Sequence, residues 1–382
     1  MAFVLSHLSC ACALGRTNAA VLGSRVVPGR RGTLGPKPAS APGMGEISGD
    51  IPGRPIHFGM VPGDLPEISE PEFDMRTNRL LLHAVRNLRA ELDAFLARHG
   101  RARVAIVLGA SNTGIDEAQR HVDRWLESGQ KPAGLYYSQI ELGTPADYLK
   151  RLLGVEGPAY TVSTACSSST KAFAAARRLI ELGVVDAAVV GGVDGRCRFA
   201  MNGFHALGAL AQGRCRPLAE DRDGINLGEA VALFTLERAD AAPASPDAVR
   251  VLLAGCGESS DAHHATAPDP EGRGAEAAMR AALADAGLRP SAVAYLNLHG
   301  TGTQANDAME LKAVRRVFGD GFTAFESTKD LTGHCLGAAG AIEAALCWLY
   351  ISSGAVSGAA MSNSFAFGGS NASVVLAPEV RA

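Results

Sequence analysis

The sequence lacks an excess of charge of either sign. Its 382 residues contain 36 lysines and arginines against 39 aspartates and glutamates, which leaves a net charge of −3. Proteins that bind nucleic acid through its phosphates usually carry a clear basic excess. We therefore expect no nucleic-acid partner. The 47% apolar content also excludes a disordered, collagen-like or coiled-coil chain, and it is sufficient for a large core.

Paired CxxC motifs are also missing. The eight cysteines are spread over a long chain, a pattern that fits neither a zinc site nor a disulfide scaffold. We expect reduced thiols, no metal ion and a cytoplasmic location.

No apolar run is long and continuous enough to predict a membrane span. The longest apolar stretch, residues 338–361, contains Glu343 and is broken by glycines and serines after Tyr350. This composition is typical of a buried helix followed by a strand.

The N-terminal region is rich in proline and glycine and poor in acidic residues. Residues 1–45 contain no acidic side chain, a composition that transit peptides share. Residues 3–5 followed by Gly15 equally fit a first strand and turn, which we favour. Residues 29–71 are rich in proline and glycine and predict a long surface excursion.

The rest of the chain alternates helical and strand patterns. Apolar residues recur at helical spacing from Leu80 to Leu96, and Gly100 ends that pattern. Further helices are expected at 171–182 and from 338 to about 350, and strands at 103–108, 160–165, 184–190, 293–298 and 373–376. We predict an α/β fold. In each half a reactive residue precedes a hydrophobic helix, which indicates an internal duplication.

Cys166 lies where an expected strand gives way to an expected helix, in the segment TACSS. Free backbone N–H groups and the positive end of a helix dipole favour a thiolate over a thiol. A buried cysteine is more often only a small apolar residue, so the case for a nucleophile depends on the other motifs.

Two histidines fall in glycine-rich motifs of the second half. His299 begins HGTGTQAND, where the glycines permit close approach of a ligand, Thr301 and Thr303 offer hydroxyls, and the acidic residues would stabilise the next helix. His334 lies in STKDLTGHCLGAAGAIE between Lys329 and Glu343. The lysine would keep both imidazoles neutral, and the glutamate could balance it in a buried network. The alternative is a surface lysine and an ordinary turn.

A third motif, NSFAFGGSN (363–371), precedes the last expected strand. Its glycines allow a tight turn that presents a backbone N–H group. Phe365 or Phe367 could close over a hydrophobic substrate.

These segments, in this order, resemble the β-ketoacyl-acyl carrier protein synthases, condensing enzymes of the thiolase superfamily. The resemblance runs nearly end to end and implies a five-layered αβαβα fold with two similar halves, which we place at 1–245 and 246–382. Only about a dozen residues separate Tyr350 from Asn363, where family members usually have a longer segment. We therefore interpret the region 351–362 as shortened.

The resemblance also implies roles for individual residues. Cys166 would accept an acyl group, and His299 and His334 would bind the malonyl thioester carbonyl, with Lys329 and Glu343 in the catalytic network. The backbone N–H groups of Cys166 and Phe367 would form the oxyanion hole. Further positions are implied to contact substrate: Thr301, Thr303, Phe365 and Phe367.

The implied activity is decarboxylative condensation of an acyl chain on Cys166 with malonyl-acyl carrier protein, in fatty-acid, polyketide or aryl polyene biosynthesis. No cofactor is expected, because the substrates travel on the phosphopantetheine of the carrier protein. The other expected partner is a second subunit, in a homodimer or in a heterodimer with a related chain. Two alternatives stay open: a non-elongating partner subunit, and a cysteine hydrolase of thioesters.

Overall fold

The computed structural model describes residues 1–17, 41–243 and 249–379. Ten of its strands form two blocks with the same internal order. Counted along the chain within each block, that order is third, second, fourth, fifth, first. The first block comprises β1 (Phe3–Cys12), β5 (Val104–Gly109), β6 (Ala159–Val162), β7 (Ala187–Asp194) and β9 (Ala230–Arg238). The second comprises β10 (Val251–Ser260), β11 (Val293–Asn297), β12 (Phe325–Glu326), β13 (Ala359–Phe365) and β14 (Ser370–Pro378).

The pairing directions repeat as well. In each block the second strand along the chain pairs in parallel with the third and with the fourth. The fifth strand pairs antiparallel with the fourth and with the first. The blocks join where β1 pairs with β10, at Val4 with Leu252 and Leu5 with Val251. This repeated topology agrees with the predicted internal duplication. The predicted boundary at 245/246 falls within 244–248, outside the described residues.

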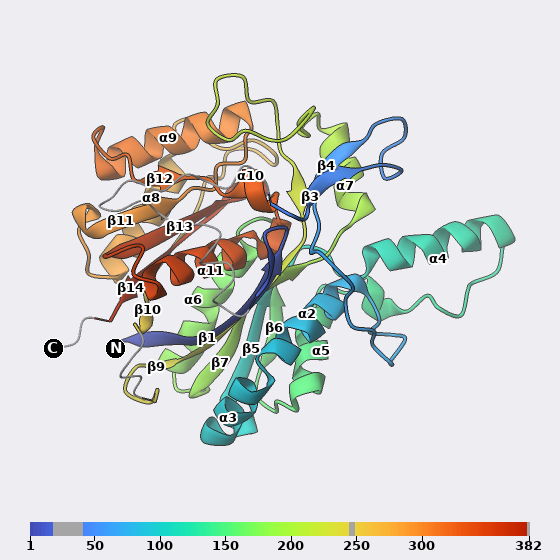
Figure 1. The fold of residues 1–382 in the computed structure, drawn as a ribbon, viewed down its shortest axis with the longest axis horizontal. Helices are drawn as coiled ribbons and strands as arrows, with labels where there is room; N and C mark the ends of the chain where they lie inside the picture. The colour runs from blue at the N-terminus through green and yellow to red at the C-terminus, as the bar shows by residue number, and fades with distance from the viewer. Residues whose placement is uncertain (18–40, 244–248, 380–382) are drawn as a thin grey trace.

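Helices cover both blocks and fill the space between them (Figure 1). The central layer is α6 (Ser168–Glu181) against α11 (Ala339–Ser352), and one outer layer is α8 (Arg273–Asp285) with α9 (Gln304–Phe318). The opposite outer layer is α2 (Arg76–Asn87), α3 (Arg89–His99) and α5 (Thr144–Leu153). The predicted five-layered αβαβα architecture is therefore confirmed. The remaining helices are α4 (Ile115–Ser128), which projects from the body, α7 (Arg198–Ala206) and α10 (Lys329–Thr332).

Several boundaries differ from the expected ones for local reasons. The single helix expected between Leu80 and Gly100 is two helices, because Leu88 leaves helical geometry between α2 and α3. Helix α6 begins at Ser168 rather than 171, where the Ser168 hydroxyl bonds back to the Ala165 carbonyl oxygen. Strand β7 continues to Asp194. At Gly192 a Cβ would lie 2.6 Å from the Ser169 side chain, so glycine there lets α6 pack closely on the strand.

The described part of the expected surface excursion, residues 41–71, is partly buried. It contains the hairpin of β3 (Met44–Ile47) and β4 (Ile56–Gly59), and β4 pairs with β8 (Leu227–Gly228). Ile51 and Phe58 pack there in one apolar cluster with Leu336, which follows His334 by two residues. Strand β1 and the turn at Gly15 form as expected, with β2 (Gly15–Thr17) returning on β1. Among the described residues, no helix has the length and apolar character needed to cross a membrane.

Candidate active site

Cys166 occupies a tight turn between β6 and the start of α6. The preceding Ala165 has a φ of 51°, a left-handed conformation that is uncommon for a residue with a Cβ. The turn is held by side chains, since the Ser167 hydroxyl donates to the Thr164 carbonyl at 2.9 Å and contacts the Ser370 hydroxyl at 3.0 Å. Strained backbone of this kind persists where the surroundings fix it, often at a functional site.

The second block repeats this turn. Leu336, which precedes α11 as Ala165 precedes α6, also has a φ of 51°. Asp194, at the end of β7, links Asn112 of the first block to Gly337 in the second turn. Its buried carboxylate accepts hydrogen bonds from the backbone N–H groups of Asn112 at 2.8 Å and Gly337 at 2.6 Å. Burial raises the Asp194 pKa to about 7, and these donors oppose that rise.

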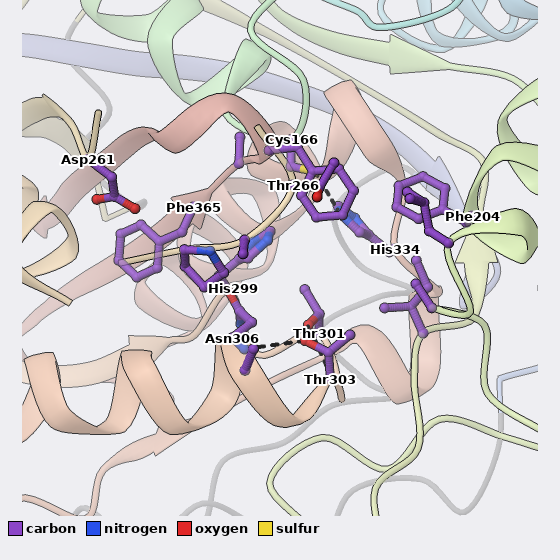
Figure 2. Close-up of a pocket in the computed structure, with 18 of the residues that line it drawn as sticks. Cys166, Phe204, Asp261, Thr266, His299, Thr301, Thr303, Asn306, His334 and Phe365 are labelled. Carbon is purple, nitrogen blue, oxygen red and sulfur yellow. Dashed lines mark hydrogen bonds between the residues drawn. The ribbon is translucent and has the colours of Figure 1, made fainter. Parts of the chain in front are cut away.

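The two turns bring Cys166 and the two predicted histidines together (Figure 2). His334 Nε2 lies 2.9 Å from Cys166 Sγ, and the His299 and His334 ring centroids are 5.3 Å apart. One ligating atom from each of the three residues falls within 4.8 Å of the others, a spacing that could also hold a metal ion. The prediction that the protein uses no metal stays a prediction.

Lys329 and Glu343 form a buried pair beside His299. Lys329 Nζ donates to Glu343 Oε1, and it also lies 3.4 Å from His299 Nδ1. Because an ammonium group can only donate, Nδ1 accepts this contact and the proton of a neutral His299 is on Nε2. Lys329 therefore sets the tautomer of His299, and the expected alternative of a surface lysine is wrong for this residue.

The site favours the neutral forms of both histidines and of the Cys166 thiol. Burial, followed by the charge of Lys329, lowers the pKa of both His299 and His334 well below the usual value. Burial raises the Cys166 pKa to about 11, although Lys329 and the backbone N–H groups of Phe367 and Cys166 lower it. The backbone donors therefore act in the expected direction, but desolvation outweighs them and the thiol keeps its proton.

The loop after His299 is held by two acidic residues of α9. Glu310 accepts hydrogen bonds from the backbone N–H groups of His299 at 2.8 Å and Gly300 at 2.7 Å. Asp307 accepts from Leu218 N at 2.9 Å and Gly302 N at 3.2 Å. We expected these carboxylates to stabilise the helix start, and they instead hold the loop. The spacing of these two acids from HGTG indicated that they lie near the loop. It could not show that their side chains point back toward the loop backbone.

A cavity of about 210 Å³ opens onto the cluster. All the residues expected to contact substrate line it: Thr301, Thr303, Phe365 and Phe367. Thr301 and Thr303 hydroxyls lie 3.0 Å apart, and the Phe367 ring packs 5.5 Å from Phe204 at the mouth. Lys329 and Glu343 lie behind the histidines and do not line the cavity.

Family comparisons agree with this geometry. The family model described as "Beta-ketoacyl synthase, N-terminal domain" matches residues 74–242, and "Beta-ketoacyl synthase, C-terminal domain" matches 251–361. Nodulation protein E of Rhizobium leguminosarum bv. trifolii is 36% identical over 301 residues, which are 71% of this chain and 74% of that protein. A 3-oxoacyl-[acyl-carrier-protein] synthase 2 of Staphylococcus aureus (strain COL) is 36% identical over 257 residues, 58% of this chain and 62% of that protein.

Solved structures cover more of the chain. A chain of the structure described as a ketosynthase (ApeO) in complex with its chain length factor (ApeC) from Xenorhabdus doucetiae is 40% identical, with a TM-score of 0.87, and the match covers 99% of this chain and 98% of that one. A Beta-ketoacyl synthase from Burkholderia phymatum STM815 is 25% identical, with a TM-score of 0.76 and full coverage of both chains. The match to nodulation protein E of Rhizobium sp. (strain N33) covers 64% of that relative. On these matches, the chain belongs to the beta-ketoacyl synthase family.

Proposed function

We propose that this protein is a β-ketoacyl-acyl carrier protein synthase that condenses an acyl chain on Cys166 with a malonyl group on acyl carrier protein. One observation carries the proposal: a buried thiol and two neutral imidazoles face one another within 4.8 Å at the end of a cavity. The pathway, whether of fatty-acid, polyketide or aryl polyene biosynthesis, is left open by these groups.

Acylation uses the contact between Cys166 and His334. The thiol sulfur attacks the acyl thioester carbon while His334 Nε2, at 2.9 Å, takes the thiol proton. The Cys166–acyl bond forms, the bond to the pantetheine sulfur breaks, and the proton passes to that leaving sulfur. Because the Cys166 pKa is raised, a free thiolate is scarce at neutral pH. Transfer of the proton to His334 during the attack removes the need for one.

Condensation uses both histidines as donors. Loss of CO₂ from the malonyl thioester leaves an enolate, whose oxygen accepts hydrogen bonds from Nε2–H of His299 and of His334. Because His334 Nε2 is unprotonated after acylation, its proton first shifts from Nδ1, which has no partner among the described residues, to Nε2. The enolate carbon attacks the acyl carbon, and the sulfur of Cys166 leaves and takes up a proton from water. The backbone N–H groups of Cys166 and Phe367 would form the oxyanion hole, which is supported by their approach to the same sulfur. Such a donor contributes about 2.7–4 kcal/mol to the transition state.

The remaining residues bind and orient. Thr301 and Thr303 would contact the pantetheine arm, and Phe365 and Phe367 would enclose the acyl end, as their place in the cavity wall supports. Lys329 would hold His299 in its Nε2–H tautomer, and Glu343 would balance the lysine charge. The proposed chemistry calls for no cofactor beyond the phosphopantetheine of the carrier protein.

We also propose that the protein works in the cytoplasm as a dimer, either with a second copy or with a related ketosynthase-like subunit. Apolar side chains on the projecting helix α4, Val122, Trp125 and Leu126, are exposed in the single chain. The solved ketosynthases with chain length factors support a partner of this kind. The division into halves near 245/246 and the shortening of 351–362, where α11 ends at Ser352 and β13 begins at Ala359, stay proposals.

Reconstitution with acyl- and malonyl-acyl carrier proteins tests the proposal. Mass spectrometry should detect a β-ketoacyl product two carbons longer than the supplied chain, and Cys166→Ala should form none. Release of free acid without malonyl-carrier protein would instead indicate a thioester hydrolase. Product formation only when a separate ketosynthase is added, and unchanged in Cys166→Ala, would indicate a non-elongating subunit.

A further inference from the structure

A second cavity, of about 180 Å³, lies against Cys166 on the side of α4 and α7. It shares Cys166, Phe204 and Phe367 with the first cavity but includes neither histidine and neither threonine. If the proposed function is right, pantetheine occupies the cavity that contains the threonines. The acyl chain on Cys166 then extends into this second space.

The wall of the second cavity is uncharged and mostly apolar, and one of its polar side chains has no hydrogen-bond partner in the described part of the chain. Most of its lining is aliphatic or aromatic, and no lysine, arginine, aspartate or glutamate is part of it. The side chain without a partner is that of Asn112, which is 3% exposed. Neither its Oδ1 nor its Nδ2 has a hydrogen-bond partner among the described residues.

The other polar groups of this wall are already engaged. The Ser111 hydroxyl donates to Asp194 at 2.8 Å, and Cys166 Sγ contacts His334. The Cys197 thiol meets the backbone N–H groups of Ala200 and Phe199. The asparagine amide is therefore the group of this wall whose hydrogen-bonding capacity is unused among the described residues.

The backbone of Asn112 is held in place beside the cavity. Its backbone N–H donates to Asp194 at 2.8 Å, and the same carboxylate holds Ser111 N at 3.0 Å and Gly337 N at 2.6 Å. This anchoring fixes the position from which the side chain enters the wall. An amide that is buried without a partner is costly, and a saturated chain packed against it would leave that cost in place.

We propose that Asn112 is a specificity-determining residue, which selects acyl chains carrying a neutral oxygen, a hydroxyl or a carbonyl, over saturated chains of the same length. The amide can donate to either oxygen through Nδ2 and can accept from a hydroxyl through Oδ1. A carboxylate is disfavoured, because the lining offers no cation and the acidic Asp194 lies behind the loop. The oxygen could stand near the thioester or farther along the chain, and these positions are separable by experiment.

A positional series of substrates tests the proposal. Thioesters of N-acetylcysteamine with chains of one length, unsubstituted or with a hydroxyl at each successive carbon, are supplied to the full-length protein. Intact-protein mass spectrometry then follows the rate of mass gain on Cys166. We expect at least one hydroxyacyl chain to react about tenfold faster than the saturated chain, as one satisfied buried hydrogen bond would give. The position that reacts fastest locates the oxygen.

Two variants separate polarity from size. Asn112→Leu keeps a similar volume without the amide and should reduce the preference to below about twofold, chiefly by accepting the saturated chain faster. Ile115→Val alters the same wall without changing its polarity and should retain the preference. If Asn112→Leu fails to fold, the rates of the hydroxyacyl and saturated chains in the wild type and in Ile115→Val still show whether the preference exists.

Equal rates for all chains in the wild type, or a preference that survives in Asn112→Leu, would overturn the inference while leaving the proposed condensation intact. No acylation by any chain, with Cys166 still alkylated by iodoacetamide, would overturn the proposed function and this inference together.

Discussion

Cys166 holds its proton at neutral pH because burial raises its pKa to about 11. A raised thiol pKa means that the thiolate fraction increases about tenfold for each pH unit below that value. Alkylation of Cys166 by iodoacetamide should therefore accelerate continuously from pH 6 to pH 9, as followed by peptide mass spectrometry. A plateau below pH 8 would show that the helix terminus and Lys329 outweigh desolvation.

The two histidines should differ in the step that they serve. The His334 side chain contacts Cys166 Sγ, whereas the His299 side chain is hydrogen-bonded to Lys329. His334→Ala should slow both acylation and condensation, and His299→Ala should slow condensation by about 10²–10⁴-fold with acylation within a few-fold of wild type. Single-turnover kinetics of each half-reaction measure the split. Equal loss of acylation in both variants would contradict the assignment.

Among individual residues, the sequence predicts the reacting side chains better than the residues that position them. Cys166, His299, His334 and Lys329 stand in distinctive local motifs, and the structure gathers them. Asp194 and Asn112 are acidic or amide residues without an obvious motif. Their importance arises from contacts between segments distant along the chain, as when Asp194 binds the backbone of Gly337, and local spacing carries no such information.

Among the elements, the contact between α6 and α11 tolerates no added volume. A Cβ at Gly340 would lie 1.9 Å from Thr170 Oγ1, which itself bonds the Ser364 hydroxyl at 2.7 Å. Gly340→Ala should lower the free energy of unfolding by about 1–3 kcal/mol through overpacking, although alanine is the better helix former by about 1 kcal/mol. Urea unfolding measures the change.

Gly203 in α7 is the matched control, because a Cβ there meets no atom within 4 Å. Gly203→Ala should be neutral or stabilising by up to about 1 kcal/mol. Equal effects at the two glycines would show that helix propensity rather than packing determines the outcome.

Helices and strands with a clear apolar period were predictable, but their ends were not. The repeat from Leu80 to Leu96 keeps helical spacing through the break at Leu88, so it gave no sign of two helices. The hairpin β3–β4 was hidden in a segment rich in proline and glycine. Its pairing with β8, more than 160 residues away in sequence, stabilises it and is invisible locally.

At the scale of the whole molecule, helix α4 stands away from the body with apolar residues uncovered (Figure 1). Leu126 is 80% exposed there, and Leu182 is 77% exposed at the end of α6. If α4 is the subunit contact, Leu126→Glu should weaken dimerisation at least about tenfold, because it places a charge in a buried apolar interface. Sedimentation velocity over a dilution series checks this.

Leu182→Glu is the matched surface control and should sediment as wild type does. A dimer that is unaffected by Leu126→Glu would exclude α4 from the interface.

The repeated strand order explains how one chain builds the site. Each half contributes a turn with a left-handed residue before a central helix, at Ala165 and at Leu336, and the two regions meet where His334 contacts Cys166. The likeness of the halves was predictable from the placement of Cys166 and His334 before apolar helices. The continuous pairing through β1 and β10 was not, because the residues that pair carry only a generic strand pattern.

The most direct measurement is a single turnover on acylated protein. Wild-type protein is loaded with one acyl group, the modified peptide is identified, and malonyl-acyl carrier protein labelled in its free carboxyl carbon is then added. The account predicts that the acyl group resides on Cys166, and that its loss, release of labelled CO₂ and appearance of the two-carbon-longer β-ketoacyl product occur together in equal amounts. An acyl group on another residue, or its loss as free acid without CO₂ release, would contradict the account.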